Sequence, residues 1–473
     1  MLARNFSVAR RHILVIFAAA ALVCTIAFYV LPTVPWRKKN SRHAYITPDD
    51  IAFTESSEQL SPSARNALCY THNVPPYLPH TSQRKVYDLF MLNTELDWLE
   101  IRLHELASQV DYFVILEAPT TFTGLPKRMY FEENKAKFHE FQDKIIHHVL
   151  EPPADGYPGH VTNATLVPGT PEYEAHAWVM ERYQRNAMFT QVLPFLSSAS
   201  TPHHNDVILV SDIDEIPRPT TVQLLRECHF GRMTTLRSRF YYYSFQWLHR
   251  GQEWAHPQAT TYHGPNNTLL PASLRERDGS ALNIPPKEEQ TIWNSSWHCS
   301  SCFATLTEML DKMKSFSHTN LNAEKFRNRE RIVARVKQGK DLWDRWFQWY
   351  ERVEGNHDLP AYLKEESGKG KFGYMVNRDG EGAGFTDYRS GLRWSAVVSA
   401  ALLTHRESPT WLHAEPGTPT VRPRQAAQRL HRVVNVNVAK VANKPVAGRP
   451  RDGSDRRHAW LWKGRRDWRR VGG

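Results

Sequence analysis

Hydrophobic residues change their spacing in a regular way from about residue 85 onward. Val86 to Leu92 is a mostly apolar run that predicts a strand. Apolar residues then recur at spacings of three and four, the period of one helix face. These residues are Leu96, Leu99, Leu103, Leu106 and Val110. Tyr112 to Leu116 predicts a second strand, which ends at Glu117. Strand, helix and strand within about 30 residues predict a βαβ unit with a right-handed crossover.

The same alternation continues along the chain. Thr94 to Asp97 has the form of a capping box at the start of the first helix. Residues 172–196 are helix-like, and 207–210 form a β-branched run of the length of a buried strand. Residues 234–247 are strand-like and rich in aromatics, which could form a sugar-stacking platform or, more commonly, core. Leu306 to Met313 predicts a short amphipathic helix. The fold class is therefore α/β.

Three carboxylates follow the strand at 207–210 directly. Asp212, Asp214 and Glu215 precede Pro217, which stops regular pairing. A central strand therefore brings an Asp-x-Asp motif to the edge of the sheet. In open α/β sheets this edge, at the carboxyl ends of the strands, is where ligands bind.

Asp212 and Asp214 are the predicted metal ligands. Hard divalent cations take carboxylate oxygens together with substrate phosphates, and they neutralise a diphosphate as it leaves. His318 is a candidate third ligand, although a lone histidine more often packs or lies on the surface. The alternative for the acidic motif is a loop that caps a helix starting at Thr220 or Thr221.

The loop after the second strand is a candidate segment for binding a nucleotide or a sugar. Thr121, Thr123 and Gly124 could present hydroxyl and backbone N–H groups to a nucleotide or sugar. Lys127 and Arg128 could reach diphosphate oxygens. A solvated turn is the alternative for the same residues.

The positive charge of the chain is concentrated at one end. The 473 residues carry a formal net charge of +11, but residues 421–473 alone carry +12 and the rest −1. The body is electrically balanced, which argues against a nucleic-acid partner. Residues 391–473 have few apolar positions, and we predict a basic, disordered tail there.

An apolar segment near the start predicts a membrane anchor. Residues 13–31 contain no charge and are long enough to span a bilayer, whereas a cleaved signal peptide would have a shorter core. We predict a cytosolic N-terminus at 1–12, a transmembrane signal anchor at 13–31 and a proline-rich stem at 32–80. The luminal catalytic domain would cover 81–390. Three N-glycosylation sequons, at Asn163, Asn266 and Asn294, mildly favour the lumen.

Five cysteines occur in the chain, and Cys24 lies in the apolar segment. Cys69, Cys228, Cys299 and Cys302 allow three disulfide pairings in an oxidising lumen, and the sequence does not choose between them. The Cys299-Ser-Ser-Cys302 spacing is also compatible with zinc. Because no second closely spaced pair occurs, disulfides are favoured.

Several motifs in order resemble glycosyltransferase family 17, the β-1,4-mannosyl-glycoprotein β-1,4-N-acetylglucosaminyltransferases. The resemblance covers roughly residues 84–390. The matching segments are 84–90, 93–103, 111–115, 121–124, Asp212 to Pro217, Trp297 to Phe303, and 384–388. The Ser317-His318 pair is more similar to fungal and plant members than to the vertebrate enzyme, which weakens a metal role for His318.

The resemblance implies a type II membrane protein of the Golgi with a luminal catalytic domain. It implies a fold of the GT-A kind, a nucleotide-sugar-binding mixed sheet flanked by helices. In this fold Asp212 and Asp214 would bind manganese (or magnesium) and the donor diphosphate. The donor would be UDP-GlcNAc, and the acceptor a β-linked mannose of a glycoprotein N-glycan, joined through a β-1,4 linkage.

An inverting displacement needs a carboxylate that takes the proton of the acceptor hydroxyl. The candidates are Glu215, Glu117 and Glu308, each with a structural alternative. Two other functions compete with glycosyl transfer. One is a magnesium-dependent Asp-x-Asp phosphatase or phosphotransferase, and the other is a non-catalytic glycan-binding protein on the same fold.

Overall fold

The computed structural model describes residues 43–45, 60–78, 83–153, 166–365 and 370–388. The predicted anchor at 13–31, the tail at 391–473 and the sequon at Asn163 lie outside these residues. Within the described ranges, no helix combines the length and the hydrophobicity required to cross a membrane.

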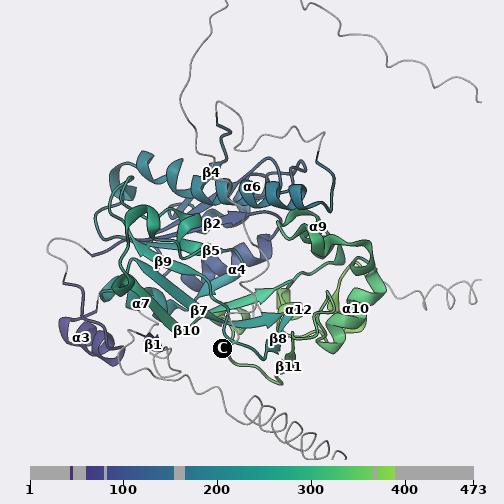
Figure 1. The fold of residues 1–473 in the computed structure, drawn as a ribbon. Helices are drawn as coiled ribbons and strands as arrows, with labels where there is room; N and C mark the ends of the chain where they lie inside the picture. Colours follow the sequence, from purple (N-terminus) through teal and green to yellow (C-terminus); the bar gives the residue numbers. More distant parts are fainter. Residues whose placement is uncertain (1–42, 46–59, 79–82, 154–165, 366–369, 389–473) are drawn as a thin grey trace, which may run out of the picture. The chain divides into compact units, whose positions relative to one another are not determined.

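The strands of the described residues form one mixed sheet (Figure 1). Its main path runs β1-β10-β7-β9-β5-β2-β3-β4, with β6 paired to β10, and β8 linking β7 to β11. Strands β2 to β5 pair in parallel, whereas β9 is antiparallel to both β5 and β7. The strands are β1 (His43–Tyr45), β2 (Val86–Leu92), β3 (Tyr112–Glu117), β4 (Ile145–Val149), β5 (Val207–Asp212), β6 (Glu215–Pro217), β7 (Met233–Tyr242), β8 (Ser244–His249), β9 (Gln258–Thr261), β10 (Glu289–Ser300) and β11 (Tyr350–Arg352).

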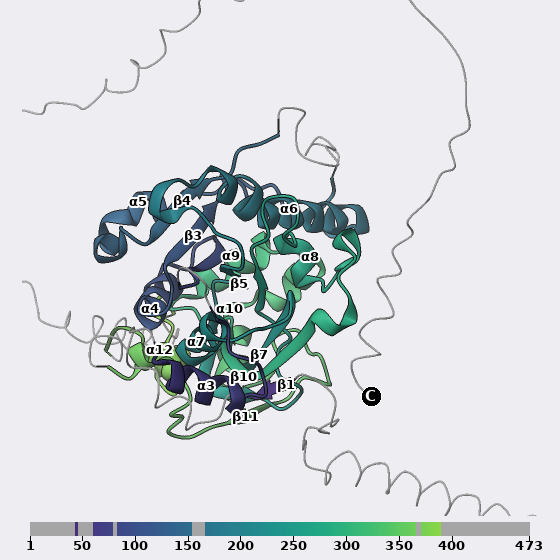
Figure 2. The ribbon, with the colours of Figure 1, turned by 90° about the vertical axis from the view of Figure 1, so that its left-hand side faces the viewer.

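Helices flank the sheet, as the alternating pattern predicts (Figures 1 and 2). They are α3 (Pro62–Thr71), α4 (Leu96–Leu106), α5 (Tyr130–Asn134), α6 (Pro171–Thr190), α7 (Pro219–Glu227), α8 (Pro271–Arg275), α9 (Leu306–Ser315), α10 (Arg329–Gln338) and α12 (Gly373–Val376). The mixed α/β class is thereby confirmed.

The predicted βαβ unit is confirmed in β2, α4 and β3, with β2 and β3 parallel. The predicted capping box at its helix is wrong. Glu95 is the N-cap residue and makes no side-chain cap bond to the helix. Its Oε2 instead accepts from the backbone N–H groups of Asn93 and Thr94, at 3.2 and 2.9 Å. The short side chain of Thr94 lies one residue before the helical turn that it would have capped.

Two apolar clusters lie on opposite faces of the parallel strands. Because strand side chains alternate between faces, Val207 and Leu209 of β5 join the cluster that contains α4. Ile208 and Val210 join the cluster that contains residues of α6. The same alternation at the strand end assigns Ser211 to the α4 face and Asp212 to the α6 face.

The aromatic segment predicted at 234–247 divides into two strands, β7 and β8. Tyr243, between them, has a positive φ of 67°, which turns the chain back on itself. Tyr241, Tyr242, Tyr243 and Phe245 are buried. These side chains therefore form core, which was the favoured interpretation, while the neighbouring Phe240 is only partly buried.

The four cysteines outside the apolar segment form two disulfides, Cys69–Cys228 and Cys299–Cys302. The first joins α3 to the end of α7, where Arg65 also pairs with buried Glu227 at 2.7 Å. Helix α3 lies within the range predicted as stem, yet Leu68 and Cys69 belong to the apolar core.

Glu105 on α4 gives the fold a pH dependence that can be measured. Burial raises the pKa of this carboxyl to about 7, although its Oε2 accepts from the backbone N–H of Tyr362. A carboxyl with a raised pKa contributes its full stability below the unfolded pKa, near 4.5, and loses it as the pH rises through 7. We expect Glu105→Gln to reduce the loss of thermal stability between pH 5 and pH 8.

The matched control is Glu140→Gln, because the side chain of Glu140 is 62% exposed. Thermal unfolding of the three proteins at both pH values provides the comparison. An unchanged pH dependence in Glu105→Gln would contradict the assignment.

Candidate functional site

The carboxyl end of β5 places Asp212 between two arginines. Its Oδ1 accepts from Arg185 of α6 and its Oδ2 from Arg275 of α8, both at 2.8 Å. Burial opposes ionisation of Asp212, but the two guanidinium groups outweigh it and hold its pKa well below the usual value. The side chain is still 38% exposed. Asp212 is therefore ionised and accessible at neutral pH.

Asp214, two residues on, is more enclosed, with a side chain only 5% exposed. Its Oδ2 accepts from Lys312 of α9 at 2.9 Å, and its Oδ1 lies 3.7 Å from Nδ1 of His298. Burial favours the neutral amine of Lys312, but the carboxylates of Asp214 and Glu95 outweigh it and raise the pKa of Lys312. Each aspartate thus has its own cationic partner from a different helix.

Glu215 is fully buried, and its carboxylate connects the backbone of Asp212 to the side chains of Trp254 and Arg275. Its Oε2 accepts from the backbone N–H of Asp212 at 2.9 Å, and its Oε1 from Nε1 of Trp254 at 2.7 Å. Arg275 pairs with both Glu215 and Asp212. Burial raises the pKa of Glu215, but Arg275 outweighs this and lowers it overall. Glu215 therefore fixes the turn in its ionised form.

Arg102 of α4 supports the same turn from the opposite face of the sheet. Its guanidinium pairs with Asp88 of β2 at 2.7 Å, and both side chains are fully buried. It also donates to the backbone carbonyls of Asp212 at 3.3 Å, Ile213 at 3.4 Å and Glu215 at 2.7 Å. Asp88 and Ser211 face α4 because of their strand parity, and Ser211 is a further acceptor for Arg102.

Helix α6 positions both arginines. Arg185 lies on it directly and also pairs with Glu181 at 2.8 Å. The neighbouring Asn186 accepts from the backbone N–H of Ala272 at 2.9 Å, at the start of α8. Helix α8, which carries Arg275, lies beside α6 (Figure 2). Adjacent residues of α6 therefore help to place both arginines.

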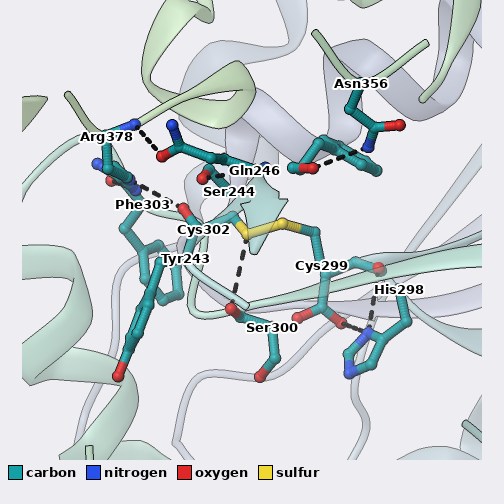
Figure 3. The surroundings of a disulfide bond; sticks show 12 residues. Tyr243, Ser244, Gln246, His298, Cys299, Ser300, Cys302, Phe303, Asn356 and Arg378 are labelled. Carbon is teal, nitrogen blue, oxygen red and sulfur yellow. Dashed lines mark hydrogen bonds and ion pairs between the residues drawn. A yellow bond between two sulfur atoms is a disulfide. The ribbon is translucent and has the colours of Figure 1, made fainter. Parts of the chain in front are cut away.

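Strand β10 and the Cys299–Cys302 disulfide brace the backbone of Asp214. The N–H of Cys299 donates to the carbonyl of Asp214 at 3.3 Å, and Nδ1 of His298 lies at the same distance from that oxygen. Figure 3 shows the disulfide directly beside His298, with Arg378 on its other side. Arg378 is buried and donates to the carbonyl of Phe303 at 2.7 Å.

Helix α9 is fixed at both of its ends. At its start, Thr305 and Glu308 form a capping box, and Asp387 accepts from the backbone N–H of Leu306 at 2.7 Å. At its end, Ser315 accepts from Nδ2 of Asn93, which follows β2, at 3.0 Å. Lys312 therefore extends toward Asp214 from a helix that is held in place.

The predicted donor loop lies against the end of α9. The Thr123 hydroxyl donates to the carbonyl of Lys314 at 2.9 Å and also bonds to the Thr121 hydroxyl. Gly124 has a φ of +80° and closes a tight turn onto Thr121. Nζ of Lys127 lies 3.8 Å from Glu117, whereas Arg128 is exposed and pairs with Glu133. The structure thus brings Thr121, Thr123 and Gly124 next to the helix that carries Lys312.

Glu117 and Glu308, two of the predicted bases, have carboxylates that already accept hydrogen bonds. Glu117 accepts from the backbone N–H groups of Phe131 and Glu132 and from His147, at 2.9 to 3.2 Å. Burial raises its pKa, but these donors outweigh it and the net pKa is lowered. Burial raises the pKa of Glu308, which accepts from Thr305.

His318 lies at the end of α9, edge-on to Trp178 of α6 with ring centroids 4.8 Å apart. Burial lowers its pKa. In the part of the chain that the structure describes, no three His, Cys, Asp or Glu side chains gather as a metal-ligand cluster. A pocket bounded by Glu100, His104 and Tyr362 contains none of the predicted site residues.

The aspartates nevertheless fit a divalent cation in kind, because their oxygens are hard ligands and Asp212 is partly exposed. Asp212 and Asp214 would hold such a cation through their carboxylate oxygens, and Lys312 already pairs with one oxygen of Asp214. Substrate phosphates supply the remaining ligands in sites of this type.

The sequence did not predict the basic side chains that pair with the motif, or the aromatic side chains that lie next to it. Lys312 follows Glu308 by four residues, so both lie on one face of α9. From that spacing, Lys312 could have been placed on the same helix face as the predicted base Glu308. Arg275 and Trp254 have no sequence signal, because β5 meets them only through tertiary packing. His256, beside Trp254, was also missed, and burial together with Arg275 lowers its pKa to about 4.

The fold and the site together define an α/β protein with a charged, partly exposed motif at the carboxyl edge of its parallel strands. The sequence model of glycosyltransferase family 17 matches residues 56–354, and the chain belongs to this family.

Its curated relatives include the β-1,4-mannosyl-glycoprotein 4-β-N-acetylglucosaminyltransferases of Rattus norvegicus, Homo sapiens and Mus musculus. Each is 26% identical to the chain over 151 residues, which is 32% of the chain. The matched region spans about a quarter of each relative, 24% of the rat and mouse proteins and 25% of the human protein.

Proposed function

We propose that this chain transfers N-acetylglucosamine from UDP-GlcNAc to a β-linked mannose of a glycoprotein N-glycan, forming a β-1,4 linkage. Family membership and the names of its relatives support the transferred sugar. The observation that carries the proposal is the Asp212-Asp214 pair at the carboxyl end of β5, bordered by Arg185, Arg275 and Lys312. We further propose that the fold is of the GT-A kind.

The proposed reaction is a single in-line displacement. The donor has an α-anomeric bond and the product a β bond, so one inversion is sufficient and no covalent intermediate is required. The acceptor oxygen attacks the anomeric carbon, its proton passes to a base, and UDP leaves with the electron pair of the broken bond. In this scheme the residues around β5 bind and orient the diphosphate.

Asp212 and Asp214 are the residues proposed to hold a manganese or magnesium ion, which would neutralise the charge of the leaving diphosphate. The loop with Thr121, Thr123 and Gly124 is the proposed nucleotide-sugar contact. The role of His318 as a third metal ligand stays a prediction, as do the diphosphate contacts of Lys127 and Arg128.

The base stays a prediction for Glu215, Glu117 and Glu308. Each has oxygens that already accept hydrogen bonds, and cationic partners or N–H donors lower the pKa of Glu215 and Glu117. A low pKa makes a carboxylate a weaker proton acceptor. Removing the true base is expected to lower the rate about 10²- to 10⁴-fold.

The proposed setting is the Golgi membrane, with a type II anchor at 13–31 and the catalytic domain in the lumen. Two disulfides in the described chain are compatible with an oxidising compartment. The division into a stem at 32–80, a domain at 81–390 and a tail at 391–473 remains part of the proposal.

The deciding experiment uses the full chain purified in detergent. It is incubated with UDP-GlcNAc, UDP-GalNAc, UDP-galactose or UDP-glucose, with and without manganese, and with a mannose-terminated N-glycan. We expect release of UDP, with UDP-GlcNAc preferred, and a product one N-acetylhexosamine heavier by mass spectrometry. Linkage analysis of the product then tests the β-1,4 bond.

Other outcomes support the competing functions. Phosphate release from a generic phosphate ester, without sugar transfer, would favour an Asp-x-Asp phosphatase. Glycan binding without UDP release would favour a non-catalytic binding protein.

A further inference from the structure

Three cations pair with the acidic motif, and each comes from a different helix, α6, α8 or α9. Arg185 of α6, Arg275 of α8 and Lys312 of α9 bring three positive charges to the three carboxylates of Asp212, Asp214 and Glu215. Without a ligand, the charges of the motif are therefore compensated by side chains.

The three cations differ in their freedom to move. Arg185 bridges Asp212 and Glu181, and Arg275 bridges Asp212 and Glu215, so each guanidinium is held by two carboxylates. Their side chains are at most 10% exposed. Lys312 is 26% exposed and reaches Asp214 with a compact ammonium on a flexible stem. Of these three, Lys312 is the cation best able to exchange its partner.

A cation that can exchange its partner would attract a diphosphate to this place. The donor and the carboxylates of Asp212 and Asp214 are both anionic, so direct approach is repulsive. The helix that carries Lys312 also contacts the proposed donor loop, through Thr123 and the carbonyl of Lys314. One helix, α9, therefore carries Lys312 to the acidic motif and also contacts that loop.

We propose that the ammonium group of Lys312 pairs with Asp214 when no donor is bound. When the nucleotide sugar binds, the same ammonium group pairs with a diphosphate oxygen instead. This inference rests on the proposed glycosyl transfer, and it identifies Lys312 as a residue that binds the diphosphate of the donor. The exchange frees the carboxylate of Asp214, so a divalent cation and Lys312 compete for the same oxygens.

The exchange predicts opposite effects on two ligands in the Lys312→Gln variant. UDP should bind about 10- to 100-fold more weakly, the range for the loss of one charge-assisted hydrogen bond. Manganese without nucleotide should bind more tightly, because Asp214 has lost its competing cation. Uridine, which has no phosphate, should bind as it does to the wild type.

The measurements are calorimetric titration of UDP at a fixed manganese concentration, paramagnetic resonance of manganese alone, and a ligand NMR titration of uridine. The matched control is Lys314→Gln on the same helix, because Lys314 pairs with the surface residue Asp311 at 3.0 Å. It should leave all three affinities unchanged. Glutamine at 312 still donates to Asp214, which protects the fold, and Lys312→Met is a second variant.

Two results separate the possible failures. If wild-type protein binds UDP and Lys312→Gln binds it equally well, the role of Lys312 is wrong and the proposed function stands. If wild-type protein binds neither UDP nor UDP-GlcNAc, the proposed function fails together with the inference.

Discussion

The Asp212→Asn variant is expected to lose at least about 100-fold in kcat for sugar transfer, the scale reported for removing one preorganised electrostatic group. Asparagine keeps the size of the side chain but removes the charge that Arg185 and Arg275 share. The two guanidinium groups then repel each other, and one ligand oxygen for a cation is lost. Asp214→Asn is expected to act in the same direction through Lys312.

Release of UDP from UDP-GlcNAc, in the presence of manganese and the glycan acceptor, measures this effect. Asp278→Asn is the control, because Asp278 follows α8 at the surface and accepts from the backbone N–H of Ser280. Circular dichroism spectra should be the same for all of these proteins. Turnover within about threefold of wild type in Asp212→Asn would remove the aspartate from the proposed mechanism.

The Arg102→Met variant is expected to lower the free energy of unfolding by about 3–5 kcal/mol, the usual cost of removing one partner of a buried ion pair. Asp88 would be left as an uncompensated buried carboxylate. The carbonyls of Asp212, Ile213 and Glu215 would also lose their donor. Urea unfolding measures the change, and Arg277→Met is the control, because its exposed pair with Glu289 is worth at most about 1 kcal/mol.

A double variant separates stability from activity. Asp88→Leu combined with Arg102→Met removes both charges, and such replacements of buried pairs are often neutral or stabilising. We therefore expect the double variant to be more stable than Arg102→Met, while sugar transfer stays low because the turn at Asp212 has lost its support. Recovery of full transfer in the double variant would show that Arg102 serves only the stability of the fold.

Local sequence patterns predicted the central part of the fold well. The first strand was predicted at the bounds of β2, and β5 was correctly placed inside the sheet, because apolar runs and their spacing are set by burial on both faces. The aromatic segment was predicted as one strand, although it bends at Tyr243. The positive φ of this tyrosine could not be predicted, because a pattern of hydrophobic residues gives no information on backbone dihedral angles.

The candidate site was predictable only in its acidic half. Asp212, Asp214 and Glu215 follow a strand in sequence, so their place at the sheet edge follows from local order. Arg275, Trp254 and Lys312 meet them from 39 to 98 residues further along the chain. Their positions depend on how α8, α9 and the segment between β8 and β9 pack against the motif, and the spacing of apolar residues does not report such contacts.

The Cys69–Cys228 disulfide has a consequence for biosynthesis. The two cysteines are separated by 159 positions, which include β2 to β5 and the whole acidic motif. At a synthesis rate of about 5–20 residues per second, Cys69 leaves the ribosome roughly 10–30 seconds before its partner exists. During that interval its thiol has to remain reduced or form an exchangeable mixed disulfide. The yield of correctly paired protein is therefore expected to depend on the isomerase capacity of the host cell as well as on its oxidising power.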